Sequence, residues 1–130
     1  MMKKINILDC TFRDGGYYNN WHFPIPLINK YLKCLSISNI NYVEIGFRSL
    51  VKDKNIGLTG YSNDIFLNKL SIPKNINLGV MINSSELISN KLNKKISIKN
   101  FFTKSSKKKI KFVRLATHIE DINKIRDAIK

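Results

Sequence analysis

The sequence predicts an α/β fold with a parallel β-sheet, and two observations lead to this class. First, four short runs of β-branched and aromatic residues alternate with segments of helical periodicity along the 130-residue chain. Second, each run ends in polar side chains, which gather at the carboxyl ends of the strands in parallel α/β proteins. The length fits one domain, residues 1–130, and the hydrophobic fraction of 43% is sufficient for a core.

The expected elements alternate along the chain. The four strands are expected at residues 5–8, 42–47, 78–82 and 110–116. After the first strand, a proline suited to the first turn introduces a helix whose apolar residues recur at helical spacing: Leu27, Ile28, Tyr31, Leu32 and Leu35. Further helices are expected at residues 64–70, at 84–92 and from about Glu120 onward.

The chain is strongly basic, with 23 Lys and Arg against 9 Asp and Glu and a formal net charge of +14. Such an excess is typical of proteins that bind nucleic acid or anionic membranes. Here the lysines are spread along the chain, and the one dense cluster, residues 104–109, is expected to be a solvated loop. Nucleic-acid binding is therefore the less favoured interpretation.

Cysteine usage and the N-terminal residues predict a cytoplasmic protein. Cys10 and Cys34 form no CxxC pair, as is usual in a reducing compartment. The apolar stretch after the N-terminal lysines is interrupted by Asp9, so it is too short for an export signal or a membrane span. No membrane partner is expected.

Glu44 is the most informative strand residue. Alternation places Val43, Ile45 and Phe47 on the face that helices would cover, and Glu44 with Gly46 on the other face. A carboxylate pointing into the inner side of a sheet requires an ion pair or hydrogen bonds. Two interpretations stay open, a structural ion pair with Arg114, which alternation places on the same inner side, and a functional role.

The residues after the first strand, Arg13 to Gly16, are expected to form a turn that suits metal and enolate chemistry. Asp14 offers a hard oxygen ligand for Mg²⁺ or Mn²⁺, and Arg13 offers a permanent positive charge for an oxygen that becomes an enolate. The alternative is an ordinary turn with a local Arg–Asp pair. The other polar groups at strand ends are Asp9, Thr11, Arg48, Ser49, Asn83, Ser84, Thr117 and His118.

Residues 9–15, DCTFRDG, resemble the opening motif of the metal-dependent lyase barrels. This superfamily includes the hydroxymethylglutaryl-CoA lyase-like proteins, the 4-hydroxy-2-oxovalerate aldolases and the pyruvate carboxyltransferase domain. The resemblance extends over residues 8–21 and 42–49 and runs more weakly to the end of the chain. It implies a (β/α)₈ barrel that makes or breaks a carbon–carbon bond next to a 2-oxo acid or an acyl-CoA.

The same resemblance implies roles for three residues. Asp14 matches the metal ligand, Arg13 matches the group that stabilises the enolate, and Glu44 matches a supporting carboxylate on the second strand. Tyr17 stands where the family usually has Gln or His, so it is expected either to act as the acid or base or to cover the site. His118 is a further candidate acid or base, or else lies at a helix entrance.

The family's late His-x-His pair of metal ligands is absent, because the chain contains only His22 and His118. The coordination shell of a bound Mn²⁺ or Mg²⁺ would therefore be completed only by ligands that this chain lacks. Eight βα units require about 250 residues, so the chain is expected to supply about four units of a TIM barrel. Such an N-terminal half-barrel is expected to be inactive alone, and to self-associate or to pair with a second half-barrel. The rival hypothesis is a non-catalytic basic module that binds nucleic acid or another anionic polymer.

Overall fold

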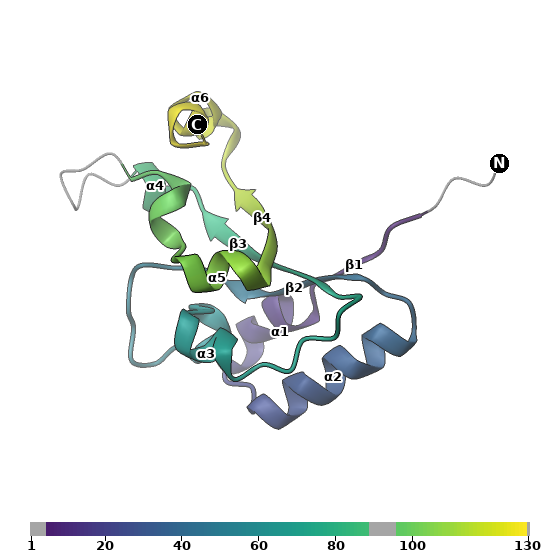
Figure 1. Ribbon diagram of the computed structural model, residues 1–130. Helices are drawn as coiled ribbons and strands as arrows, with labels where there is room; N and C mark the ends of the chain where they lie inside the picture. The colour runs from purple at the N-terminus through teal and green to yellow at the C-terminus, as the bar shows by residue number, and fades with distance from the viewer. Residues whose placement is uncertain (1–4, 89–95, 130) are drawn as a thin grey trace.

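The computed structural model describes residues 5–88 and 96–129 and confirms the α/β class. Four parallel strands form one sheet in the order β1-β2-β3-β4, and helices alternate with them along the chain (Figure 1). The strands are β1 Leu8–Asp9, β2 Tyr42–Phe47, β3 Asn77–Asn83 and β4 Ile110–Ala116. Neighbouring strands of this sheet are consecutive in the sequence, which is the arrangement produced by repeated βα units.

Helices and short 3₁₀ turns connect the strands. The α-helices are α1 Thr11–Asn19, α2 Ile25–Ile37, α3 Asp64–Asn68, α4 Ser85–Ile88, α5 Lys104–Lys109 and α6 Ile122–Ile129. The 3₁₀ helices include η1 Leu58–Gly60, η3 Ile98–Phe101 and η4 Ile119–Asp121. The predicted helix at 84–92 is α4 as far as Ile88, and residues 89–92 of that prediction lie outside the described residues.

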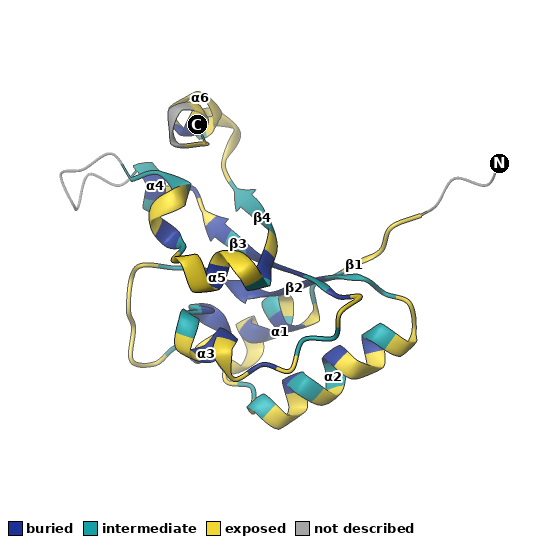
Figure 2. Cartoon of the chain, viewed as in Figure 1, coloured by how far each residue is buried: buried dark blue, intermediate teal, exposed yellow. Residues whose placement is uncertain are grey.

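The main hydrophobic core lies between the sheet and the helices that pack on one of its faces (Figure 2). Ile28, Leu32 and Leu35 of α2 are buried there, at the spacing that the sequence predicts. Val43 and Ile45 of β2 belong to the same core and are inaccessible to solvent, so alternation assigns their face correctly. The same prediction is wrong for Phe47, because the register is irregular between Glu44 and Phe47 and the Phe47 ring packs against Trp21 outside this core. A smaller cluster consists of Ile82, Leu87 and Phe101.

The expected turn at residues 13–16 is wrong, because these residues lie inside helix α1. Gly16 is buried beneath the indole ring of Trp21, and a Cβ atom at this position would overlap that ring. Tertiary packing therefore selects a helix although two adjacent glycines weaken its intrinsic propensity. The helix ends at Asn20, which has a left-handed backbone with φ of 53°.

The expected basic loop at 104–109 is also wrong, because this segment is the helix α5. The hydroxyl of Thr103 accepts hydrogen bonds from the backbone N–H groups of Ser105 and Ser106, and the Ser106 hydroxyl accepts one from Thr103 N–H. This reciprocal cap satisfies donors that a helix start otherwise leaves unpaired. The lysines in the last turn of α5 are placed favourably for the helix dipole.

The first strand is shorter than predicted, with two residues in place of residues 5–8. β1 lies at the edge of the sheet and pairs only through Leu8 and Asp9 with β2. Ile5 and Ile7 are exposed at 84% and 56%. Within residues 5–88 and 96–129, no helix combines the length and the apolar character that crossing a bilayer requires.

Candidate functional site

The face of the sheet opposite the core carries a buried charge cluster. Glu44 is inaccessible to solvent, and its Oε1 accepts hydrogen bonds from Arg13 Nε at 2.7 Å and from Arg114 Nη2 at 3.0 Å. Its Oε2 accepts from Arg114 Nε at 2.6 Å. The ion pair with Arg114 that alternation suggested is thus present, and Arg13 joins it from α1.

The two guanidinium groups keep Glu44 ionised. Burial alone would raise the pKa of this carboxyl, but the hydrogen bonds and charges of Arg114 and Arg13 outweigh burial and lower it. A carboxylate with a lowered pKa and occupied oxygens is a poor proton acceptor. The geometry makes Glu44 a group that positions the two arginines.

Arg13 bridges the buried carboxylate and the surface. Its side chain is 15% exposed, and its Nη1 lies 2.5 Å from Oδ1 of Asp14 in addition to the Nε contact with Glu44. Burial would lower the pKa of Arg13, whereas the hydrogen bond and charge of Glu44 raise it. A guanidinium has five N–H donors, and these two contacts use only those on Nε and Nη1. A further hydrogen bond joins Arg13 to the Cys10 side chain, and the donors still left can serve an anionic ligand.

Cys10 lies beside the same cluster. Its Sγ is 4.0 Å from Nη2 of Arg114. Burial and then the charge of Glu44 raise the pKa of the Cys10 thiol, so at neutral pH it is a thiol and not a thiolate. The sequence offered no signal for this placement, because Cys10 and Arg114 are 104 residues apart.

The described residues do not by themselves fit a divalent metal ion. Asp14 is 63% exposed and paired with Arg13, and both oxygens of Glu44 are engaged by arginines. Nowhere in the described ranges do three or more His, Cys, Asp or Glu side chains come close enough to hold an ion together. Asp9 at the end of β1 serves the local structure, since its carboxylate accepts from the hydroxyls of Thr11 and Tyr31 at 2.9 and 3.0 Å.

A hollow of about 300 Å³ opens at the carboxyl ends of β2 and β3, and we call it the aromatic hollow. Tyr17, Trp21 and Phe47 form one side, with ring centroids 4.9 Å apart for Tyr17–Trp21 and 5.5 Å for Trp21–Phe47. These rings meet edge to face, which is a favoured aromatic arrangement. Its polar lining consists of Ser49, Asp53, Tyr61, Asn83 and Glu86.

The profiles of known protein families give no match, and neither do the curated protein sequences. A solved structure does match, described as the "N-terminal domain of a putative aldolase" from Bacteroides vulgatus. The two share 27% sequence identity with a TM-score of 0.71 over 92% of this chain and 38% of the other. The fold is therefore aldolase-related. The chain spans about two fifths of the length of that matched domain.

The two histidines lie apart from the charge cluster. His118 is exposed at the start of η4, and no hydrogen bond or ion pair in the described part of the chain joins its ring to Arg13, Glu44 or Arg114. The Nε2 atom of His22 lies 3.1 Å from the carbonyl oxygen of Asn55, so His22 supports a loop. A catalytic role for His118 stays a prediction.

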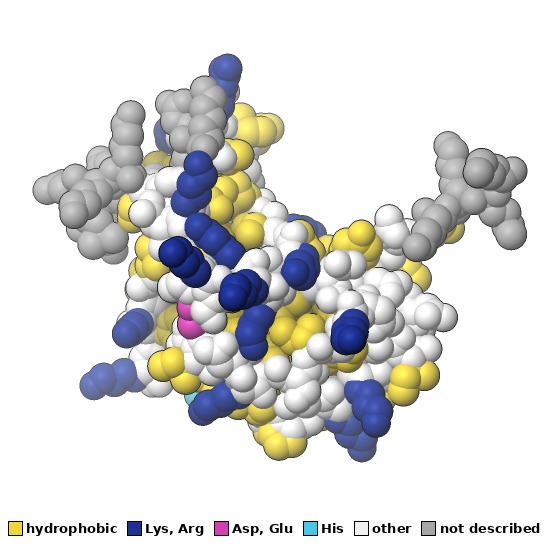
Figure 3. Space-filling view, viewed as in Figure 1, with side chains coloured by type: hydrophobic (Ala, Val, Ile, Leu, Met, Phe, Trp, Pro, Cys, Tyr) yellow, Lys and Arg dark blue, Asp and Glu magenta, His cyan; other side chains and the backbone are white. Residues whose placement is uncertain are grey.

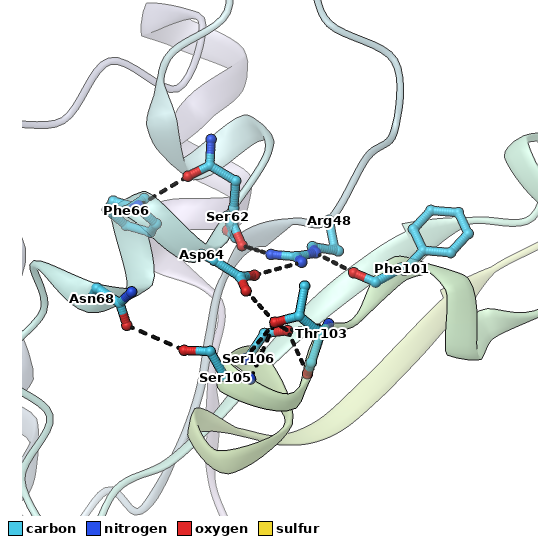
Figure 4. A network of polar contacts seen from close by, with 10 residues as sticks. Arg48, Ser62, Asp64, Phe66, Asn68, Phe101, Thr103, Ser105 and Ser106 are labelled. Atoms are coloured by element: carbon cyan, nitrogen blue, oxygen red, sulfur yellow. Dashed lines mark hydrogen bonds and ion pairs between the residues drawn. The ribbon is translucent and has the colours of Figure 1, made fainter.

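Arg48, which follows β2, is buried in a separate network (Figure 4). Its Nε donates to the carbonyl oxygen of Phe101 at 2.7 Å, its Nη1 donates to that of Ser62, and its Nη2 lies 2.8 Å from Oδ1 of Asp64. Asp64 also accepts from the hydroxyl of Thr103. Burial would raise the pKa of Asp64, and the hydrogen bonds of Thr103 and Arg48 lower it. This strand-end arginine joins three segments of the fold.

Proposed function

We propose that this chain carries part of the active site of an aldolase-type lyase, which cleaves a carbon–carbon bond next to a 2-oxo acid. The observation that carries the proposal is Arg13, a largely buried guanidinium held between Glu44 and Asp14, with N–H donors that neither carboxylate takes. It lies in α1, directly after the first strand, on the side where parallel α/β proteins place their chemistry. The aldolase-related fold supports this assignment.

The reaction would be the cleavage of a 4-hydroxy-2-oxo acid. The C4 hydroxyl loses its proton to a base and becomes an aldehyde while the C3–C4 bond breaks. The electron pair of that bond forms the enolate of pyruvate, whose C3 then takes up a proton. Arg13 would donate hydrogen bonds to the oxygen on which the negative charge develops, and such preorganised donors contribute strongly to catalysis.

Glu44 and Tyr17 would have supporting roles in this reaction. Glu44 would hold Arg13 and Arg114 in place and keep both charged, since hydrogen bonds and charge lower its pKa despite burial. Tyr17 follows Arg13 by about one turn of α1, so its side chain would lie beside Arg13 on the same side of that helix. Its hydroxyl would contact the C4 hydroxyl, which is the group that releases a proton.

The chain's motif resembles that of the metal-dependent lyases of the hydroxymethylglutaryl-CoA lyase type, which use an ion such as Mn²⁺ or Mg²⁺. Asp14 could contribute one carboxylate, but the described residues offer too few ligands for tight binding. Such an ion would need ligands from outside them. No step of the proposed reaction is therefore assigned to a metal ion.

Binding of oxalate, a planar mimic of the pyruvate enolate, tests the role of Arg13 directly. We expect the 130-residue chain to bind oxalate, and Arg13→Ala to weaken binding by about a hundredfold because it removes a charged donor. Arg126→Ala, which removes an exposed arginine from α6, is the matched control and should leave binding unchanged. Equal affinities of the wild type and Arg13→Ala would show that Arg13 does not hold the enolate.

Pyruvate release from 4-hydroxy-2-oxo acids, with Mn²⁺ or Mg²⁺ added, tests the reaction itself. We expect any turnover to disappear in Arg13→Ala while the far-ultraviolet circular dichroism stays unchanged, since Glu44 keeps Arg114 as a partner. If Arg13→Ala retains the wild-type rate, the lyase proposal is wrong.

A second candidate is a basic module that binds the phosphate backbone of nucleic acid. The observation that favours it is a pair of adjoining hollows lined by lysines. Two hollows of about 580 and 400 Å³ share Ile72 and Pro73 in their walls. No acidic side chain lines either of them, and together they contain Lys30, Lys33, Lys74, Lys108, Lys109 and Lys111. The face with α2, α3 and α5 likewise shows many basic and few acidic side chains (Figure 3).

Retention on immobilised DNA at increasing salt distinguishes the two candidates. A nucleic-acid module should elute later than a variant in which Lys107, Lys108 and Lys109 are changed to Gln, and its affinity should fall steeply with salt. Retention that is the same for both proteins would remove this candidate.

A further inference from the structure

We propose that the aromatic hollow binds an uncharged group with several hydroxyls, namely the part of the substrate that leaves as the aldehyde. This inference rests on the proposed lyase function and names the substrate class of the same site. The volume of about 300 Å³ is at the lower end of the range of small-molecule pockets. Its floor lies at the carboxyl ends of β2 and β3, where Phe47 and Asn83 end their strands.

Direct contacts join the lining of the hollow to Arg13. The indole Nε1 of Trp21 donates to the carbonyl oxygen of Arg13 at 3.0 Å, and the ring packs on Gly16. Tyr17 lies four residues after Arg13 in α1, so both side chains are on one side of the helix. A substrate whose oxo-acid end contacts Arg13 would therefore place its other end in the hollow.

The charges of the lining exclude an anionic group. The side chains of Asp53 and Glu86 line the hollow, whereas no Lys, Arg or His does so, although the chain has a formal net charge of +14. One oxygen of each carboxylate accepts a loop N–H, that of Asn55 at 2.9 Å for Asp53 and that of Leu50 at 2.8 Å for Glu86. Both carboxylates are thus held beside the hollow, where they would repel a negative ligand.

The mixture of donors and acceptors favours hydroxyl groups over a cation. The amide of Asn83 can donate and accept, and the two carboxylates accept. The hydroxyls of Ser49 and Tyr61 donate to the carbonyl oxygens of Val51 and Asp53, so toward a ligand they act as acceptors. A hydroxyl group can accept from the exposed amide of Asn83 and donate to a carboxylate, whereas an ammonium group only donates and leaves that amide to water. The aromatic rings offer apolar faces for the C–H groups of a carbon chain.

Three ligands with the same carbon chain test this charge preference, namely D-glucitol, D-glucamine and D-gluconate, which are neutral, cationic and anionic. Trp21 is the one tryptophan of the chain and lines the hollow, so its fluorescence and its indole N–H resonance report occupancy. We expect a saturable change with D-glucitol, and binding at least about tenfold weaker for the two charged analogues. No response to D-glucitol, or an equal response to a charged analogue, would overturn the proposal.

Two asparagines on the same face of β3 provide a matched pair of variants. Asn83→Leu removes a polar group from the hollow and should weaken D-glucitol binding about tenfold. Asn77→Leu makes the same change at the amino end of the strand, outside the hollow, and should have no effect. Equal losses in both variants would show that the ligand does not contact Asn83.

Oxalate binding, measured on the same protein, separates this inference from the proposed function. Binding of D-glucitol without any Arg13-dependent binding of oxalate would contradict the lyase function and the leaving-group role, and would leave the ligand class of the hollow supported. Binding of oxalate without D-glucitol would overturn this inference alone.

Discussion

Arg13 in α1 and Glu44 in β2 form a hydrogen-bonded ion pair, with 2.7 Å between Nε and Oε1. Glu44 is inaccessible to solvent and Arg13 is 15% exposed, so the pair connects the first helix to the inner side of the sheet. Arg114 completes the cluster from β4. The chemistry proposed for Arg13 depends on this connection.

Removal of the Glu44 charge should destabilise the protein more than removal of the Asp14 charge. Glu44→Gln leaves two guanidiniums facing a neutral amide and should cost about 3 kcal/mol of unfolding free energy. Asp14→Asn removes an exposed partner and should cost less than about 1 kcal/mol. Urea unfolding of the two variants measures the difference, and equal losses would contradict a structural role for the buried pair.

Acid should destabilise the protein through Glu44. Burial would raise the pKa of this group, but the arginines lower it below its ordinary value of 4.5. A lowered folded-state pKa means that the stabilisation is complete above the unfolded-state pKa and is lost as the pH falls through the folded-state pKa. We expect the urea concentration at the midpoint of unfolding to be constant near neutral pH. It should decrease when the pH is lowered below 4.5.

The Glu44→Gln variant is the control for this pH dependence. It should lose less stability than the wild type over the same acid range, although it is less stable at neutral pH. Some dependence should remain, because hydrogen bonds of Thr103 and Arg48 also lower the pKa of Asp64 against the effect of burial. Parallel curves for the two proteins would show that Glu44 does not titrate in this way.

The same Gly-to-Ala change in the neighbouring strands β2 and β3 should have different effects at Gly46 and at Gly79. A Cβ atom on Gly46 would overlap the backbone carbonyl of Thr59, which cannot move without displacing η1. A Cβ atom on Gly79 would overlap the outer end of the Phe112 ring, which is half-exposed. We expect a cost of more than about 3 kcal/mol for Gly46→Ala and of about 1 to 2 kcal/mol for Gly79→Ala.

Thermal unfolding measures this difference, and a second substitution provides its control. Phe112→Leu should restore most of the stability lost in Gly79→Ala but none of that lost in Gly46→Ala. A larger loss at Gly79 than at Gly46 would contradict the packing described here.

Arg48 should be irreplaceable by lysine. Its guanidinium contacts Phe101, Ser62 and Asp64 in three directions, and an ammonium group on a flexible stem cannot reproduce this fork. Both Arg48→Met and Arg48→Lys should cost about 3 kcal/mol of unfolding free energy, because buried acceptors lose their donors. Arg126→Met on the exposed side of α6 is the control and should be neutral within about 0.5 kcal/mol. Rescue by lysine would argue against the network.

The sheet edges should promote self-association of the 130-residue chain. β1 and β4 are the outer strands of the described sheet, and the apolar residues Ile5 and Ile7 beside β1 are exposed. We expect the elution volume in size-exclusion chromatography to decrease with concentration, and an Ile5→Lys, Ile7→Lys double variant to shift it towards the monomer. A concentration-independent monomer would contradict the prediction.

The succession of the four strands and of the helices α2, α3, α4 and α6 could be predicted from the sequence because it follows from local periodicity. Alternation in residues 42–47 also identified Glu44 as facing away from the core, and it offered Arg114 as its partner. The helix α5 was missed because its stability comes from Thr103 and Ser106 capping a short run of serines and lysines. The helix α1 was missed because Trp21 packs on Gly16 and so favours a conformation that glycines disfavour locally.

The sequence by itself determined the α/β class, the positions of β2, β3 and β4 and the side of the sheet on which Glu44 lies, because these depend on repeats of two or three to four residues. Only the tertiary structure decided that Arg13 and Arg114, which are 31 and 70 residues from Glu44, share its carboxylate. It also decided that Arg48 is buried and that a hollow forms beside Trp21. Periodicity determines the direction of a side chain, whereas its contacts depend on how distant segments pack.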